Sequence, residues 1–526
     1  MAVATPRFTN TLSGQKDPLQ PLEPGKVRLY VCGPTVYDDA HLGHARCYVT
    51  WDVLLRALRF LGYDVRYARN VTDVDDKILA RARQNGEPFE ALAERYIARF
   101  HEDMAALNVL PPTEEPRATA FIEEMIAGVE ALLAAGYAYC APDGTVYFRT
   151  AAKADYGKLC KQPLDDLRQG ARVELNPHKE SPLDFALWKG IAADDPDGWP
   201  SPWGRGRPGW HLECSAMNHR LFGAQIDIHA GGADLTFPHH ENEIAQSEAW
   251  TGCAPFAGLW LHNGFVNVSG EKMSKSLGNF ATVRTLLTQY DTNTIRYFLL
   301  TNHYRMPVDF TDTALNGARN RMIKIHRALR SACQTLGLCS QTLAEQPIGE
   351  RFERERSSLL DAFGAALCDD LNTPQALATL DEAITALNRA NQPDAAQPEG
   401  LQFDLPTIRA RFLEALTIWT HLGFDAQQAL TSEAGSETSE GGFSAETRDA
   451  LRLIARELGG DWLAPDPSAS QALAQIIAYR QEARATKNWA QSDAIRQHLQ
   501  DVGIRLMDRK DGGIDWEWLS PKPESV

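Results

Sequence analysis

The sequence predicts an α/β fold: a parallel-sheet domain with an inserted subdomain, then a helical bundle and a small mixed α/β C-terminal module. Three observations predict it. The chain opens with a strand–helix–strand pattern at 27–69, a similar pattern returns at 224–266, and the sequence reads as helical from 313 to about 422. Strands joined through a helix lie parallel in one sheet, so the first two stretches are assigned to one domain.

The opening unit is defined by its apolar spacing. Val27–Cys32 reads as a buried strand, and Gly33-Pro34-Thr35 breaks it. Apolar residues then recur at helical spacing from about Leu42 to Phe60, and Gly62 ends the helix. Asp64–Arg69 reads as the second strand, so a parallel pair is expected here.

The segment from Thr113 to about Pro208 is predicted to interrupt the sheet. It holds a helix that runs to Ala135 and a hairpin over Tyr137–Phe148, turned at Pro142-Asp143-Gly144. Its last part, Pro177–Gly209, is rich in proline, glycine and tryptophan and is predicted to be loop-like.

The sheet pattern resumes with a strand at Ala224–Ala230, a helix from about Pro238 to Trp250 and a strand at Leu259–Val266. In the helical region that follows, Asn372-Thr373-Pro374 predicts a helix start, because asparagine caps a helix and proline is tolerated in its first turn. Thr431–Gly442 reads as a low-complexity linker. The last ~55 residues are expected to be helical to about 502 and then strand-like, a module at the low end of domain size.

Bulk composition indicates a soluble protein of several domains. The chain has 526 residues and a net charge of -16, which argues against a generally basic nucleic-acid binder but leaves local basic patches open. The odd count of nine cysteines argues against a disulfide framework. No apolar run is long enough to span a bilayer, and Met1–Leu12 lacks an export pattern, so a cytoplasmic protein is expected.

The stretch Gly264–Phe280 reads G-F-V-N-V-S-G-E-K-M-S-K-S-L-G-N-F. Its glycines provide hinges, and Lys272, Ser274 and Lys275 can bring ammonium and hydroxyl groups to a polyphosphate. A solvated basic loop is the alternative for any two such lysines. The complete K-M-S-K-S string resembles the second signature of class I aminoacyl-tRNA synthetases, and the resemblance implies a site for ATP.

A second phosphate-binding pattern, His41-Leu42-Gly43-His44, lies where the first strand leads into its helix. A helix start offers unpaired N–H groups and the positive end of the dipole, and Gly43 lets a ligand approach the backbone. His41 and His44 can both donate to phosphate oxygens. Two capping histidines with structural bonds are the alternative. The pattern resembles the H-I-G-H signature of the same class, with leucine in place of isoleucine.

Four residues of metal-ligand type stand at informative places. Cys32 ends the first strand, Cys214 follows Gly209 in G-W-H-L-E-C, and His239 and Glu243 share one face of a helix. Two thiolates, an imidazole and a carboxylate form a plausible tetrahedral zinc set. Because no C-x-x-C pair anchors them, buried thiols and a structural histidine are an equally open interpretation.

Longer strings resemble the cysteinyl-tRNA synthetase family specifically. They are Y-V-C-G-P-T-V-Y-D at 30–38, N-V-T-D-V-D-D-K at 70–77, G-W-H-L-E-C-S-A-M at 209–217 and P-H-H-E-N-E-I-A-Q at 238–246. The resemblance runs from Leu22 to about Asp312 and continues into Cys368–Leu380. It implies a Rossmann-like catalytic domain that uses ATP with Mg²⁺, L-cysteine and tRNA(Cys).

The resemblance also implies roles for individual residues. The zinc ligands would be Cys32, Cys214, His239 and Glu243, while His240 and Glu241 match the motif but not the ligand positions. Catalytic roles would fall to His41, His44, Lys272 and Lys275, and ATP binding to these four with Gly43 and Ser274. Trp210 is a candidate lid over the substrate side chain, and Thr72 and Asp73 are candidates for binding the amino-acid backbone. A core tryptophan and a loop-capping role are the respective alternatives.

Two basic stretches are candidates for contact with tRNA. Arg319–Arg330 holds five Lys/Arg and no acid, and Arg480–Lys510 holds seven Lys/Arg against four acids. Trp489, Trp516 and Trp518 lie in or near the second stretch, and exposed aromatics beside cations suit unpaired bases. A solvated helix face is the alternative for the first stretch, and at least one of the two last tryptophans is expected in the core.

The expected domains are a catalytic domain at 1–112 and 209–312, a connective insertion at 113–208, a helical tRNA-binding domain at 313–430, a linker region at 431–470 and an anticodon-binding module at 471–526. A monomer is expected. An ATP-independent zinc protein, a ligase that transfers cysteine to an amino-sugar and a non-catalytic tRNA-binding relative are the rival interpretations. The intact signatures argue against the last, and the tail from Gln471 to Trp518 favours tRNA over an amino-sugar.

Overall fold

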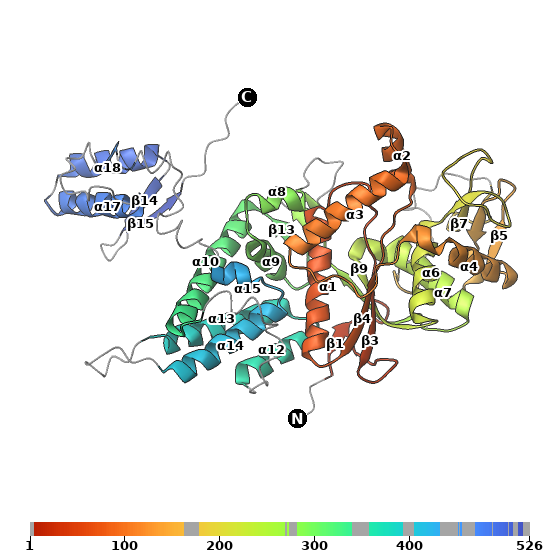
Figure 1. Cartoon of the computed structure of the whole chain (residues 1–526), viewed down its shortest axis with the longest axis horizontal. Coiled ribbons are helices and arrows are strands. Elements are labelled where there is room, and N and C mark those ends of the chain that lie inside the picture. The colour runs from red at the N-terminus through yellow and green to blue at the C-terminus, as the bar shows by residue number, and fades with distance from the viewer. Residues whose placement is uncertain are drawn as a thin grey trace. The chain divides into compact units, whose positions relative to one another are not determined.

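The computed structural model describes residues 5–161, 178–268, 271–272, 281–338, 357–392, 404–431, 451, 453–454, 469–486, 488–502, 504–508 and 514–518. The chain divides into two compact units, Met1–Leu430 and Thr431–Val526. Figure 1 shows both units, and each is described by itself below. Among the described residues, no helix combines the length and apolar character needed to cross a membrane.

The centre of the first unit is a four-stranded parallel sheet in the order β10-β9-β3-β4. Its strands are β3 (Lys26–Val31), β4 (Asp64–Arg69), β9 (Ile226–Gly232) and β10 (Ala257–Asn263). The chain leaves β3 toward β4 on one side and returns to β9 on the other, so the connections reverse between β3 and β9. Both faces are buried: Leu29 and Val31 pack in one apolar cluster, and Tyr30 and Cys32 in another. The predicted parallel sheet is confirmed.

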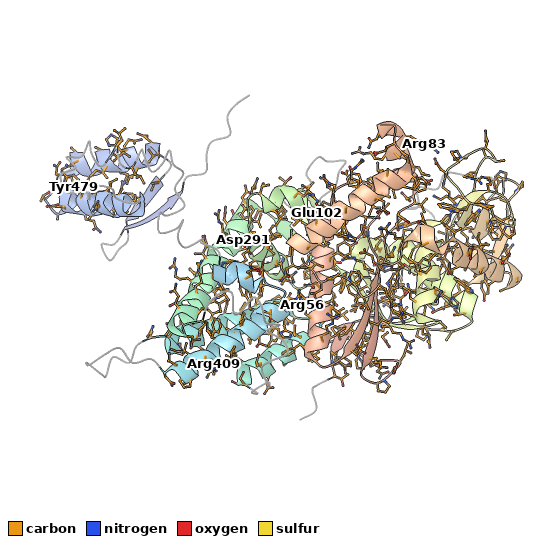
Figure 2. All side chains as sticks on the ribbon, viewed as in Figure 1. Arg56, Arg83, Glu102, Asp291, Arg409 and Tyr479 are labelled. Atoms are coloured by element: carbon orange, nitrogen blue, oxygen red, sulfur yellow. The ribbon has the colours of Figure 1, made fainter. Side chains whose placement is uncertain are left out.

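Helix α1 (Leu42–Phe60) spans the predicted residues. It lies between the sheet and later helices of the same unit, which include Thr292–Leu300 and Leu405–His421 (Figure 1). Gly62, at φ 94°, adopts a backbone conformation that suits glycine just beyond the helix end. Arg56, labelled in Figure 2, donates to Asp52 at 2.9 Å and to the carbonyl of Thr420 at 3.2 Å. Asp52 also accepts from Arg296 at 2.6 Å, and both of these side chains are fully buried. This pair joins α1 to α9 (Thr292–Leu300).

The N-terminal part of the first unit contains further strands and helices. They are β1 (Arg7–Thr9) and β2 (Lys16–Pro18), which pair antiparallel, and α2 (Asp76–Asn85), α3 (Phe89–Ala106), η1 (Ala118–Phe121) and α4 (Ile122–Ala134).

The insertion builds an antiparallel sheet in the order β5-β6-β7-β8. The predicted hairpin is present as β5 (Ala138–Cys140) and β6 (Val146–Phe148), followed by η2 (Thr150–Ala152). The prediction of a loop over Pro177–Gly209 is wrong, because β7 (Phe185–Gly190) and β8 (Gly206–Pro208) lie within it. β8 has only three residues and ends in proline, and β7 ends at Gly190 within a stretch rich in proline and glycine, so the turn residues obscure both strands.

Between β8 and β10, the chain also forms α6 (Trp210–Phe222), η3 (Ala233–Leu235), the π-helical turn η4 (Thr236–His240) and α7 (Glu241–Thr251). The predicted strand Leu259–Val266 is two strands, since β10 ends at Asn263 and β11 (Val266–Val268) belongs to another sheet, β12-β11-β13. Gly264 separates them. A Cβ there would lie 2.6 Å from the carbonyl carbon of Met306, so the two backbones meet where no side chain fits.

The small sheet is completed by β12 (Glu271–Lys272) and β13 (Val308–Phe310), with α8 (Val283–Leu287) nearby in sequence. The helical region consists of α10 (Asp312–Thr335), α12 (Ser358–Cys368), α13 (Thr373–Ala390), α14 (Leu405–His421) and α15 (Ala426–Thr431). The predicted start of α13 is confirmed: Asn372 accepts from the N–H of Gln375, and Pro374 lies in the first turn.

The second unit contains α17 (Ala469–Ala485), α18 (Trp489–Asp501), β14 (Ile504–Asp508) and β15 (Ile514–Trp518). The two strands pair antiparallel, and residues such as Ile476, Ile495 and Leu506 form a separate apolar core. The expectation of helices followed by strands is confirmed. Residues 432–442 of the predicted linker lie outside the described part of the chain.

Candidate active site

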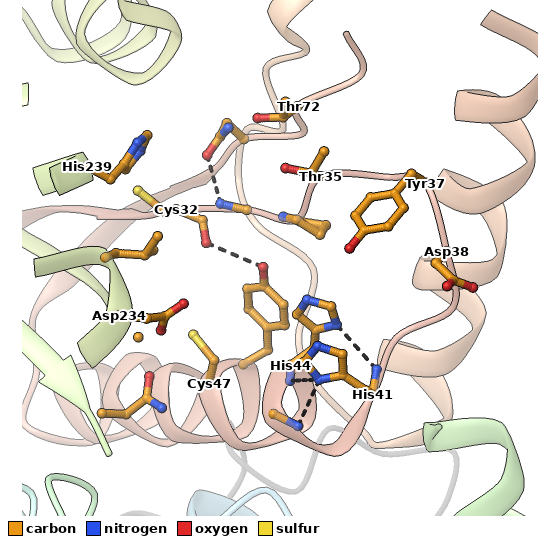
Figure 3. Close-up of a pocket in the computed structure, with 18 of the residues that line it drawn as sticks. Cys32, Thr35, Tyr37, Asp38, His41, His44, Cys47, Thr72, Asp234 and His239 are labelled. Atoms are coloured by element: carbon orange, nitrogen blue, oxygen red, sulfur yellow. Dashed lines mark hydrogen bonds between the residues drawn. The ribbon is translucent and has the colours of Figure 1, made fainter. Parts of the chain in front are cut away.

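A cavity of about 370 Å³ opens at the carboxyl ends of β3 and β9, where the sheet connections reverse. Such a reversal point is where open α/β sheets bind ligands. Cys32, Cys214 and His239 line one part of it, and His41 and His44 another. Figure 3 shows Cys32 and His239 on one side of this space and the two signature histidines on the other.

His41 and His44 form a reciprocal cap at the start of α1. Nδ1 of His41 accepts from the N–H groups of Gly43 at 3.1 Å and His44 at 3.3 Å, and Nδ1 of His44 accepts from the N–H of His41 at 3.2 Å. The rings stack with centroids 3.8 Å apart. Since both Nδ1 atoms are acceptors, each neutral ring carries its proton on Nε2. The cap thus prepares two Nε2–H donors beside the positive end of the helix dipole.

The loop after β3 is held against the loop after β4. The N–H of Gly33 donates to Oδ1 of Asn70 at 2.8 Å, and a Cβ on Gly33 would lie 1.5 Å from the carbonyl oxygen of Asn70. A short parallel bridge joins Thr35 to Thr72. Only glycine permits this approach, which fixes the floor of the cavity next to Cys32.

Cys32, Cys214, His239 and Glu243 meet in one buried cluster, with one ligand-type atom from each and all four atoms within 4.8 Å of one another. The two sulfur atoms are 3.9 Å apart, and Nε2 of His239 is 3.0 Å from Oε1 of Glu243. Two sulfurs bonded to a tetrahedral zinc ion at about 2.3 Å would lie about 3.8 Å apart. The donor set and the spacing of its two sulfur atoms therefore fit zinc.

A second group of four, Cys32, His229, His240 and Glu243, is also close enough to hold a metal ion. Position distinguishes the two groups. Cys214 and His239 line the cavity, whereas His229 and His240 are buried and are not among its lining residues. The first group is thus the one that contributes three of its four residues to the cavity lining.

Neighbouring histidines orient the first group. Nε2 of His229 lies 2.8 Å from Oε2 of Glu243, Nδ1 of His211 lies 2.9 Å from Nδ1 of His239, and Nε2 of His240 lies 3.3 Å from the sulfur of Cys32. Hydrogen bonds of this kind hold metal ligands in place and tune their basicity. His229 lies outside the quoted family strings, and His211 stands in one of them without a stated role, because the contacts of a buried histidine leave no local periodicity.

Charges within the cluster shift its pKa values. Burial raises the pKa of Cys32. Burial also acts to raise the pKa of Cys214, but the bond to Cys32 and the charge of His239 outweigh it and lower that pKa to about 6. For Glu243, His229 and His239 outweigh burial and lower the pKa to about 2. A thiolate and a carboxylate are therefore both present near neutral pH, as a cation site requires.

The other sequence-predicted residues are placed differently. Trp210 is half-buried, lines the cavity and lies with its ring centroid 4.2 Å from that of His239. Thr72 lines the cavity but donates its hydroxyl to Glu213 at 2.8 Å. Asp73 accepts from the N–H and hydroxyl of Thr119 at 2.9 and 2.6 Å and is not among the lining residues, which is the arrangement of its capping alternative.

The K-M-S-K-S segment begins beside the cavity. Lys272 is in β12, which pairs with β11, and β11 starts at the lining residue Val266. Ser274 and Lys275 lie outside the described residues. The lining residues that were not singled out from the sequence include Thr35, Tyr37, Lys77, Asp234 and Asn263, and the first three of these belong to the quoted family strings.

Comparison with known proteins identifies the family. The model of the class I (C) tRNA synthetase catalytic domain matches residues 18–320, the DALR domain matches 362–410, and the cysteinyl-tRNA ligase anticodon binding domain matches 466–516. Cysteine–tRNA ligase of Hahella chejuensis is 44% identical over 97% of this chain and 99% of its own length. That of Laribacter hongkongensis is 44% identical over 96% and 98%. The chain belongs to the cysteine–tRNA ligase family.

Solved structures show that this cysteine–tRNA ligase family member has the class I synthetase fold. Mycobacterium tuberculosis methionyl-tRNA synthetase in complex with methionyl-adenylate matches with a TM-score of 0.51 and 17% identity, over 81% of this chain and 96% of its own. The ternary complex of Agrobacterium radiobacter K84 LeuRS with tRNA and LeuAMS matches with a TM-score of 0.53 and 12% identity, over 79% and 86%. At these identities the likeness concerns the fold alone.

The residues of the two predicted basic stretches of this family member differ in exposure. On α10, Lys324 and Arg327 are exposed, whereas Arg321 pairs with Asp381 of α13. In the second unit, Trp489 is 57% exposed at the start of α18. Side chains of Trp516 and Trp518 lie outside the described residues.

Proposed function

We propose that the chain activates L-cysteine with ATP, releasing pyrophosphate, and then transfers cysteine to the 3′ end of tRNA(Cys). The observation that supports this most is the shared cavity. A sulfur-rich group of metal ligands faces the same 370 Å³ space as the two donors at the start of α1. One end suits a thiol and the other suits a triphosphate.

The ligands proposed for zinc are Cys32, Cys214, His239 and Glu243. When bound, zinc supplies a borderline-soft Lewis acid that accepts a substrate thiolate and lowers the thiol pKa. Serine offers a harder and far less acidic hydroxyl, so the choice depends on chemistry rather than size. Hydrophobic pockets separate near-isosteres by only about 10². A sulfur-selective site therefore makes a separate editing site unnecessary.

Activation needs no protein nucleophile. The cysteine carboxylate attacks the α-phosphorus, and pyrophosphate leaves in line with Mg²⁺ accompanying ATP. We assign the Nε2–H groups of His41 and His44 to the triphosphate, next to Gly43 at the start of α1. Lys272, Ser274 and Lys275 are proposed to close over the pyrophosphate, with Lys275 stabilising the charge that develops in the transition state.

We assign the substrate side chain to a space closed by Trp210, which already lies against His239. Thr72 is proposed to bind the amino-acid backbone by exchanging its bond to Glu213 for one to the ligand. Asp73 is proposed to act indirectly, because its carboxylate caps the turn at Thr119.

The domains proposed for these steps keep the expected boundaries: 1–112 and 209–312 catalytic, 113–208 connective, 313–430 helical and tRNA-binding, 431–470 linker, and 471–526 anticodon-binding. The matched anticodon-domain model supports the last assignment. A cytoplasmic monomer is proposed as the working form.

Cysteine-dependent exchange of labelled pyrophosphate into ATP tests activation, and charging of tRNA(Cys) tests transfer. The full chain should perform both reactions with cysteine and neither with serine. A chain ending at Leu430 should retain exchange and lose charging, because the second unit has its own core. Absence of exchange with cysteine in the full chain would contradict the proposed function.

A further inference from the structure

A buried carboxylate outside the cavity connects the helical region to the catalytic domain. Asp370, between α12 and α13, is 1% exposed. It accepts hydrogen bonds from the N–H and hydroxyl of Thr9 at 2.8 and 2.6 Å, the hydroxyl of Tyr304 at 2.9 Å and Nε of Arg305 at 3.0 Å. One side chain of the helical region thus binds β1 and the turn before β13.

The backbone at this carboxylate is held in an uncommon conformation. Asp370 has φ 61° and Leu371, a buried residue, has φ 47°. Left-handed backbone is tolerated by aspartate but unfavourable for leucine, so surrounding contacts must maintain it. The N–H of Asp370 donates to the carbonyl of Arg7 at 2.8 Å, which is one of those contacts.

The turn that Asp370 binds also accepts hydrogen bonds from a residue of α1. Arg46, on α1, donates to the carbonyls of His303 at 3.0 Å and Met306 at 3.3 Å. Arg46 lies two residues after His44 on the same helix. The turn at 303–306 is therefore fixed between the helix that begins with the phosphate donors and the helical region.

The same turn supports the cavity wall. Gly264 donates its N–H to the carbonyl of Tyr304 at 2.8 Å, and the carbonyl of Phe265 accepts from Val308 at 2.9 Å. Gly264, Phe265 and Val266 all line the cavity. Beyond the wall, β13 pairs with β11, and β11 pairs with β12, which contains Lys272. A shift of the turn would consequently move the start of the K-M-S-K-S segment.

We propose that Asp370 is a positioning residue for the activation step. Its carboxylate fixes the turn at 303–306, and the turn fixes the wall Gly264–Val266 and the strand pair that leads to Lys272. The inference rests on the proposed function, since it names a residue that sets the ATP side of that site. The zinc ligands lie at the end of β3 and on α6, η4 and α7, and none of the hydrogen bonds that Asp370 makes among the described residues goes to these elements.

Two conservative variants separate positioning from simple stabilisation. Tyr304→Phe and Thr9→Val each remove one hydroxyl donor from the same carboxylate, but only Tyr304 belongs to the turn behind the cavity wall. Both should lower the melting temperature by similar amounts and retain the wild-type zinc content. Tyr304→Phe should also lower kcat of cysteine-dependent pyrophosphate exchange by about tenfold, with KM for cysteine within about twofold of wild type.

Asp370→Asn should act in the same direction as Tyr304→Phe and more strongly. Equal kcat values for Tyr304→Phe and Thr9→Val, with exchange intact in the wild type, would overturn the positioning role. A rise in KM for cysteine matching the fall in kcat would also overturn it, because the effect would then reach the zinc side. Absence of exchange in the wild type would instead overturn the proposed function itself.

Discussion

The most quantitative prediction concerns His229, whose Nε2 lies 2.8 Å from Oε2 of Glu243 with both side chains fully buried. Phenylalanine at 229 would keep a ring stacked on Trp260, at a centroid distance of 4.5 Å, and would remove both ring nitrogens, of which only Nε2 makes a hydrogen bond among the described residues. Oε2 of Glu243 would then have no other hydrogen-bond partner among the described residues. A hydrogen bond to a charged group is worth about 1.5–3 kcal/mol.

That range corresponds to a loss of about 10–100-fold in zinc affinity, the effect usual for partners of metal ligands. Titration of the purified protein with a competing chelator, followed by zinc content, measures it. His219→Phe is the matched control, because His219 is exposed and stacks on Trp250 away from the cluster. Wild-type zinc affinity in His229→Phe, or an equal loss of zinc affinity in both variants, would show that His229 does not support Glu243 as a zinc ligand.

Three further predictions concern stability, catalysis and tRNA. Arg296→Met should lower the free energy of unfolding of the first unit, measured by urea denaturation, by about 3–5 kcal/mol. The reason is that Asp52 would remain a buried charge with only Arg56 as its cationic partner. The pKa of Asp52 is lowered because Arg56 and Arg296 outweigh burial, so this stabilisation is present above the unfolded pKa, is lost as pH falls through the folded one, and should shrink in the variant. Lys275→Ala should cut the exchange rate far more than cysteine affinity, and equal losses would contradict a transition-state role. Trp489→Ala should raise KM for tRNA in charging by about 5–150-fold, as expected for one stacked base, and leave exchange unchanged; an altered exchange rate would argue against this role.

The parts of the fold that follow from sequence are those with long, periodic signals. Helix α1 begins and ends at the predicted residues because apolar spacing, the histidine cap and Gly62 agree. Strands β7 and β8 were missed because they lie among proline and glycine, and β8 has only three residues. The break of the last predicted strand at Gly264 depends on Met306, which approaches only in the folded chain.

The sequence predicts the metal ligands, the histidines that support them and the cavity-lining residues to different extents. Cys32 and Cys214 are separated by 182 positions, and only the family strings joined them before the structure placed their sulfurs 3.9 Å apart. Of the supporting histidines, His211 and His240 stand in family strings and His229 does not, and none of these positions states the supporting role, since that role is set by tertiary contacts. Asp73 stands in a family string, yet its carboxylate is engaged by Thr119. A motif names residues that matter without stating which of them face the ligand.

Whether zinc selects cysteine is tested by measuring zinc content together with the preference for cysteine over serine in pyrophosphate exchange, on the wild type and on Cys214→Ser. We expect one zinc ion per wild-type chain, a preference well beyond the roughly 10² that shape alone provides, and loss of both in the variant. A wild-type protein without zinc that still strongly prefers cysteine would contradict selection by zinc.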